Sequence, residues 1–126
     1  MKPGLEIGYV ETLKVVVTSD MFASFNEKVV HPLYSTVSLV HHMEWVSRKV
    51  ILPFLEEHEE GMGAEVSVKH LSPAKEGSNL LFSAKVIESS HRSVVTEVEV
   101  KCGEVKIAIG NVRQAILPKK TIQSFY

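Results

Sequence analysis

The chain has 126 residues and a formal net charge of -1, with 14 basic and 15 acidic side chains spread along its length. Binding to nucleic-acid phosphates usually requires a basic excess, so we expect small-molecule or protein partners and no nucleic acid. The single cysteine, Cys102, excludes an internal disulfide and favours a reducing compartment, and no apolar run approaches the roughly 20 residues that span a bilayer. We therefore expect one cytoplasmic domain over residues 1–126, with no membrane partner.

The first part of the chain joins a strand pattern to a loop pattern. Residues 11–22, ETLKVVVTSDMF, contain a β-branched run that predicts a strand. Residues 23–34, ASFNEKVVHPLY, indicate a loop that Pro32 closes before the next element begins.

A long helix is predicted over residues 35–57, STVSLVHHMEWVSRKVILPFLEE, which is apolar over more than half of its circumference. Pro53 removes one backbone donor and should kink the helix or break it near Leu52. We expect the glycines of EEHEEGMG, Gly61 and Gly63, to end the helix. A flat sheet would leave much of the apolar surface of this helix exposed to solvent, so we expect a curved sheet to wrap around it. We expect the apolar edge that remains to form a dimer contact.

Beyond Gly63 the apolar residues alternate with a period of two, which is typical of strands. The predicted strands cover residues 64–71, 79–89, 93–101 and 104–117. The turns between them, SPAKEGS, SSHR and CGE, are short enough to force antiparallel neighbours, which predicts a meander. The fold class is therefore α+β, with a curved antiparallel sheet around one long helix.

Glu44 is a candidate catalytic residue because of its place on the predicted helix. At about 100° per residue it projects within about 40° of Val37, Val40, Ile51 and Leu55, so its carboxylate should lie in the apolar stripe. The alternative is a surface ion pair with an arginine one helical turn later, at position 48. The helix pattern alone leaves both interpretations open.

His70 and Thr36 are the other two candidates. In AEVSVKHL the alternation places His70 on one face with Val66 and Val68, and that face should contact the helix. A lone histidine there is more often a hydrogen-bonded core residue than a catalyst. Thr36 stands at the helix start, where it or Ser35 could cap free backbone amides, or where the same amides could hold an oxyanion.

The remaining signals are weaker. Three further histidines, His41, His42 and His58, give no closed ligand spacing, so we expect no metal site. The chain has no GxxxxGK, no GxGxxG after a strand and no GxSxG. Its only aspartate, Asp20, has no histidine close behind it, which argues against an Asp/His hydratase.

The segment STVSLVHHMEWVSRKVILPFLEEHEEGMGAEVSVKHLSPAKEG resembles the hot-dog-fold thioesterases of the fluoroacetyl-CoA thioesterase type. The resemblance rests on the joint spacing of a threonine, a helical MEW, a proline near the helix end, a glycine and a VxH strand. In this chain these are Thr36, Met43 to Trp45, Pro53, Gly63 and the VKH ending at His70. More weakly, the resemblance extends over nearly the whole chain.

The resemblance implies an acyl-CoA thioesterase with Thr36, Glu44 and His70 as its catalytic trio. The backbone amide of Gly63 would help to polarise the thioester carbonyl, and no metal or organic cofactor would be needed. In the fluoroacetyl-specific enzyme, aromatic residues upstream of the threonine close over the acyl group, whereas Glu27 and Val30 fall there in this chain. Val30 is therefore expected to contact a different acyl group of small or medium size.

The resemblance also implies a homodimer, or a tetramer as the larger assembly, with the acyl site near the subunit contact. Two alternatives stay open. One is a non-catalytic hot-dog module that binds acyl-CoA or serves as an assembly subunit, and the weaker one is a hydratase.

Overall fold

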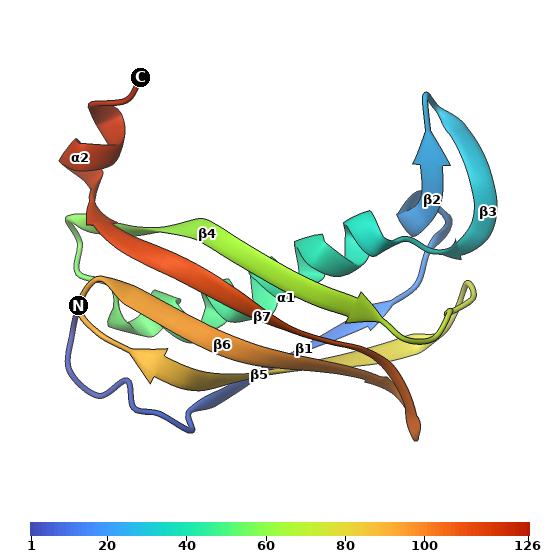
Figure 1. Ribbon diagram of the computed structural model, residues 1–126, viewed down its shortest axis with the longest axis horizontal. Helices are drawn as coiled ribbons and strands as arrows, with labels where there is room; N and C mark the ends of the chain where they lie inside the picture. Colours follow the sequence, from blue (N-terminus) through green and yellow to red (C-terminus); the bar gives the residue numbers. More distant parts are fainter.

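The structure is a computed structural model that describes residues 1–126. The elements in chain order are β1 (Val10–Val16), β2 (Phe22–Phe25), β3 (Lys28–Tyr34), α1 (Thr36–Ile51), β4 (Glu59–His70), β5 (Asn79–Ser89), β6 (Ser93–Cys102), β7 (Val105–Pro118) and α2 (Lys119–Gln123), with short 3-10 helices at Ser19–Met21 and Leu52–Phe54. The long helix α1 runs along one face of a curved antiparallel sheet (Figure 1). The predicted α+β class and the sheet wrapped around one helix are confirmed.

The five-stranded sheet has the order β1-β5-β6-β7-β4. The predicted meander is confirmed for β5, β6 and β7, but the prediction that β4 neighbours β5 is wrong. β4 pairs with β7 at the far edge, and residues 71–78 carry the chain back across to β5. This crossing segment is fixed by backbone hydrogen bonds from Tyr34 to Ala74 and between Val17 and Gly77. Short spacing alone therefore did not make the two strands neighbours.

The loop predicted over residues 23–34 is instead a β-hairpin that projects from one end of the sheet (Figure 1). Strands β2 and β3 pair from Phe22 opposite Tyr34 to Phe25 opposite Lys28. The turn residues Asn26 and Glu27 have φ angles of 53° and 64°, the left-handed region that a two-residue hairpin turn requires. An Asn-Glu pair is a weak turn signal because glycine normally occupies the second position.

The helix ends where Pro53 predicts, but the following glycines do not end it. α1 stops at Ile51, and the 3-10 turn that contains Pro53 follows at once, so the break near Leu52 is confirmed. Gly61 and Gly63 lie inside β4, which already begins at Glu59. Pro53 ends the helix about eight residues before Gly61, and the backbone at both glycines is extended.

The core lies between α1 and the sheet. The helix buries Leu39, His42, Met43, Val46, Ser47, Val50 and Ile51. Two buried hydrogen bonds anchor it: Ser47 Oγ lies 2.8 Å from Thr96 Oγ1, and Gln114 Nε2 donates to the Ser47 carbonyl at 2.8 Å. β7 passes close to α1 at Gly110, where a β-carbon would stand 2.7 Å from the Met43 methyl. This polar and steric fit fixes which face of α1 meets the sheet.

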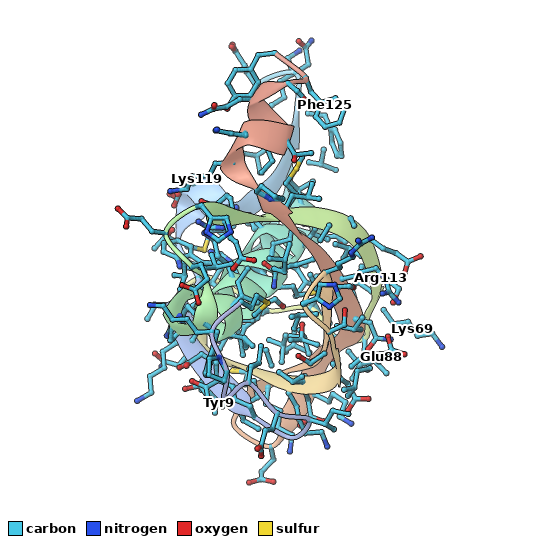
Figure 2. The ribbon with its side chains drawn as sticks, turned by 90° about the vertical axis from the view of Figure 1, so that its left-hand side faces the viewer. Tyr9, Lys69, Glu88, Arg113, Lys119 and Phe125 are labelled. Carbon is cyan, nitrogen blue, oxygen red and sulfur yellow. The ribbon has the colours of Figure 1, made fainter.

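The ends and outer surfaces carry the remaining features. α2, which the sequence did not predict, stands away from the sheet with the exposed Phe125 just beyond it (Figure 2). Arg113 pairs with Glu65 and Glu88, and Figure 2 shows Arg113 and Glu88 on the side of the sheet away from α1. None of the helices combines the length and apolar character that a bilayer crossing requires.

Candidate active site

The start of α1 separates the roles of Ser35 and Thr36. Ser35 is the N-cap residue, with extended backbone angles, and its hydroxyl accepts a hydrogen bond from the Ser38 amide at 3.0 Å. The Thr36 hydroxyl is thus left for another partner, and its Oγ1 lies 3.0 Å from Nδ1 of His70. The interpretation of Thr36 as the side-chain cap is wrong, because Ser35 fills that position.

His70 reaches Thr36 from the last position of β4. Val66 and Val68 on the same face pack against the core, so the predicted orientation of this face toward the helix is confirmed. Burial lowers the pKa of His70, and the backbone of Ser72 opposes this only in part. The second ring nitrogen, Nε2, is buried and has no hydrogen-bond partner. A buried polar atom of this kind calls for an explanation, and a bound substrate can supply its partner.

Glu44 does not lie in the buried stripe of α1. Its side chain is exposed in the single chain, on the side of the helix that also leaves Val37 73% exposed. The expected location in the apolar core is therefore wrong. The Arg48 ion-pair alternative is also wrong, because Arg48 binds Glu60 at 2.9 Å and Glu44 has no ion pair.

The neighbour of Glu44 is Gly63 on β4. A β-carbon added to Gly63 would stand 3.1 Å from Glu44 Oε1, so only a glycine leaves the carboxylate its full room. The β4–β7 register shifts between Gly63 and Glu65, which leaves Ala64 unpaired in a local bulge. Bulges of this kind often lie beside active sites, where they redirect the backbone.

The four predicted residues thus form two separate pairs within one chain. Thr36 contacts His70, and Glu44 contacts Gly63. Glu44 lies about two turns, or roughly 12 Å of helix rise, beyond Thr36. No ion pair joins Glu44 to His70, and the carboxylate is not among the causes that shift the histidine's pKa.

A cavity of about 600 Å³ opens between the β2–β3 hairpin, the start of α1 and the segment after β4, and Thr36 and His70 line it. This volume falls within the range of small-molecule sites. Val30, which the sequence suggested as an acyl contact, is 62% exposed and lies outside it. The wall residues that the sequence did not suggest are Asp20, Phe22, Ala23, Ser24, Phe25, His31, Leu33, Tyr34, Val37, Ser38, Leu71, Ser72 and Pro73. Without the hairpin pairing, the sequence offered no signal that Phe22 and Phe25 would face a cavity.

The arrangement has the parts that acyl transfer requires. A hydroxyl, an imidazole and the amides of a helix start converge on one cavity wall, where they can hold a carbonyl oxygen and move a proton. A carboxylate is present on the same helix to act on water or on a carbonyl carbon.

Comparisons with known proteins agree with this chemistry. The family described as fluoroacetyl-CoA-specific thioesterase matches residues 17–120. A hypothetical protein of Thermus thermophilus, described as a thioesterase superfamily member, has 37% identity and a TM-score of 0.93, with 98% of this chain and 91% of that chain covered. No curated protein matches the sequence.

Two more distant structures share the fold. The fluoroacetyl-CoA thioesterase itself has 21% identity and a TM-score of 0.88, with 96% of this chain and 94% of that chain covered. A hot-dog-like protein from Thermanaerovibrio acidaminovorans has 17% identity and a TM-score of 0.86, with 98% and 89% covered. The chain belongs to the fluoroacetyl-CoA-specific thioesterase family, a family of acyl-CoA thioesterases with the hot-dog fold.

Proposed function

We propose that this acyl-CoA thioesterase hydrolyses thioesters of small or medium acyl groups, with Thr36, Glu44 and His70 as its catalytic residues. The observation that carries the proposal is the 3.0 Å contact between Thr36 Oγ1 and His70 Nδ1 on the cavity wall. Solved structures of the fluoroacetyl-CoA thioesterase hold acetyl-CoA in one case, and fluoroacetate with CoA in another. These complexes support a CoA thioester as the substrate of this chain.

In the proposed reaction water adds to the thioester carbonyl carbon and the carbon–sulfur bond breaks, giving a free acid and the CoA thiol. The carboxylate of Glu44 removes a proton from the attacking water. Alternatively, the carboxylate attacks the carbonyl carbon itself and expels the CoA thiolate, and water then cleaves the transient anhydride to give the free acid and restore Glu44. Thr36 and the amides at the start of α1 hold the carbonyl oxygen as negative charge develops. His70 relays a proton to the departing thiolate.

The acyl size follows from the cavity and from the hairpin. Glu27 stands in the hairpin turn and Val30 faces solvent, so neither closes over an acyl group in the single chain. The walls combine Phe22 and Phe25 with polar groups such as His31, which suits a short acyl chain better than a long apolar one. A fluorinated acyl group is not part of the proposal.

We propose further that the enzyme is a cytoplasmic homodimer that pairs two β4 strands. β4 is 12 residues long and forms an edge of the sheet, so its outer backbone groups have no neighbouring strand. On α1, Val37 is 73% exposed and projects about 20° around the helix axis from Glu44, on the side next to β4. A second copy would cover both features and would bring a second Glu44 to the site. The free thiol of Cys102 suits a reducing compartment.

The test is a screen for free-thiol release from acyl-CoAs of increasing acyl length, with wild-type protein and the Glu44→Gln variant in parallel. We expect turnover of short and medium acyl groups by the wild type and loss of turnover in the variant. Binding of acyl-CoA without any thiol release would instead favour the non-catalytic module. A product formed by adding water to an enoyl-CoA would favour the hydratase.

A further inference from the structure

A second pair of polar side chains lies next to the Thr36–His70 contact. The hydroxyl of Tyr34, the last residue of β3, lies 2.5 Å from Nδ1 of His42 on α1. Both side chains are buried, with Tyr34 at 1% exposure and His42 at 7%. Two polar groups placed this deeply are costly unless each satisfies the other.

The same tyrosine contacts the candidate catalytic histidine. The edge of one ring meets the face of the other, with the centroids of Tyr34 and His70 6.3 Å apart and the planes at 78°. The rings of Tyr34 and His42 are nearly parallel, with an angle of 6°, and the Phe82 ring also packs against His42 with the centroids 5.7 Å apart. Tyr34 also stands two residues before Thr36 in the chain, and it lines the same cavity as Thr36 and His70.

The charge states of the pair follow from its surroundings. Burial raises the pKa of Tyr34 far above its usual value, so the hydroxyl keeps its proton and donates. Burial, and then the neighbouring His41, lower the pKa of His42, while Asp20 acts in the opposite direction. His42 is therefore neutral near pH 7, with Nδ1 accepting from the tyrosine and the proton on Nε2.

We propose that Tyr34 and His42 form a positioning pair, which fixes the ring of His70 against Thr36 without touching the substrate's reacting atoms. The pair locks the tyrosine ring, and the tyrosine ring forms the wall against which the His70 ring rests. This inference rests on the proposed role of His70, and its first test does not require activity.

The first test is a titration of the imidazole rings by NMR in wild type and in His42→Leu. In the wild type, His42 should show the tautomer with the proton on Nε2. In His42→Leu the tyrosine hydroxyl loses its partner and its ring is no longer held, so water reaches His70 and its pKa rises toward that of a free imidazole. An unchanged His70 titration would overturn the inference, whether or not the protein hydrolyses acyl-CoA.

The second test is kinetic. Tyr34→Phe and His42→Leu should each lower kcat about tenfold, with KM changed by less than about threefold, because the reacting groups are misplaced rather than lost. His42→Asn should restore most of kcat, since its amide oxygen falls near the position of Nδ1. Tyr9→Phe, which removes a surface hydroxyl that bonds only to Glu11, is the matched control and should keep the wild-type kcat.

The double variant Tyr34→Phe with His42→Leu separates positioning from stability. It leaves no unpaired polar atom, so its unfolding free energy should recover toward that of the wild type. Its kcat should remain about tenfold lower than that of the wild type. Phenylalanine at position 34 and leucine at position 42 cannot form the hydrogen bond that fixes the aromatic ring beside His70. Full recovery of kcat together with stability would overturn the positioning role and leave a purely structural one. If the wild-type protein hydrolyses no acyl-CoA, the proposed function is refuted. The NMR titration would still show whether Tyr34 and His42 position the ring of His70.

Discussion

The carboxylate of Glu44 and the backbone of Gly63 lie in direct contact, so close that a methyl group on the glycine would stand 3.1 Å from Oε1. The contact joins α1 to the bulged part of β4, and it places the carboxylate beside backbone groups that the β4–β7 ladder leaves irregular. This geometry explains why a glycine suits this position although the chain there is extended and needs no left-handed angle.

Gly63→Ala tests this contact. The added methyl group is within tight van der Waals distance of a flexible carboxylate, so the side chain can yield by a few tenths of an ångström and the fold should persist. We expect kcat to fall about tenfold because the carboxylate is displaced from its working position. Thiol-release kinetics and a thermal melt check both parts. Wild-type kcat in Gly63→Ala would show that the working position of the carboxylate does not depend on this contact.

Glu44→Gln separates the charge of this side chain from its shape. Loss of a general base or nucleophile should lower turnover at least about a hundredfold. Because Glu44 is exposed and has no ion pair, we expect the free energy of unfolding to change little. Glu60→Gln, which breaks the 2.9 Å contact with Arg48, is the control and should keep its activity. Wild-type turnover in Glu44→Gln would remove Glu44 from the mechanism.

Ser35 and Thr36 can be assigned separate roles by two substitutions. Ser35→Ala removes the cap of α1 and should cost about 1 kcal/mol of stability while leaving kcat nearly unchanged. Thr36→Val keeps the shape but removes the hydroxyl that meets His70, so it should lower kcat at least about tenfold with little loss of stability. Thr36→Ser should retain most of the activity. The opposite pattern, with Ser35→Ala inactive and Thr36→Val active, would exchange the two roles.

Much of this site followed from the sequence because local rules decided it. The alternation of Val66, Val68 and His70 fixed the inward face of β4, and Pro53 fixed the end of α1. Capping rules favoured Ser35 and Thr36 equally, and only the position of His70 across the fold shows which hydroxyl is free.

Other features depend on contacts that no local pattern encodes. The β2–β3 hairpin turns at Asn26 and Glu27, where no glycine marks the turn. Residues 71–78 cross back over the sheet, and β4 is therefore an edge strand. The periodicity of apolar residues in α1 does not predict which side of the helix the sheet leaves exposed. The exposed position of Glu44 follows from the edge position of β4 and from the open side of α1. The prediction that Glu44 is buried failed because it misjudged the tertiary arrangement, while the helical phase of the residues was correct.

Stability should fall on mild acidification. Burial lowers the pKa of both His42 and His70 below the usual 6.5, so the unfolded chain binds more protons than the folded one as the pH falls through that value. The free energy of unfolding should therefore decrease from about pH 7 downward and level off below the folded-state pKa values. Urea unfolding at a series of pH values measures this loss. The double variant Tyr34→Phe with His42→Leu should show a smaller decrease, and a flat profile in the wild type would contradict the burial of both rings.

A last prediction concerns how the two pairs of site residues meet. Within one chain Glu44 and His70 do not touch, although the proposed reaction needs both at one carbonyl group. In an antiparallel pair of β4 strands, a pairing centred between Val66 and Ser67 places the Gly63 of one subunit opposite the His70 of the other. The carboxylate held at Gly63 would then serve the Thr36–His70 contact of the second subunit.

Mixing two inactive variants tests this arrangement. If the residues act across subunits, a heterodimer of Glu44→Gln and His70→Ala has one site with both defects and one site that is intact. Equal mixing gives heterodimers for half of the molecules, so unfolding and refolding the mixture should recover about a quarter of wild-type activity. Sedimentation equilibrium establishes the dimer beforehand, and each variant refolded alone is the control. If Glu44 and His70 act within one chain, every heterodimer site carries one defect, and the mixture stays as inactive as its components.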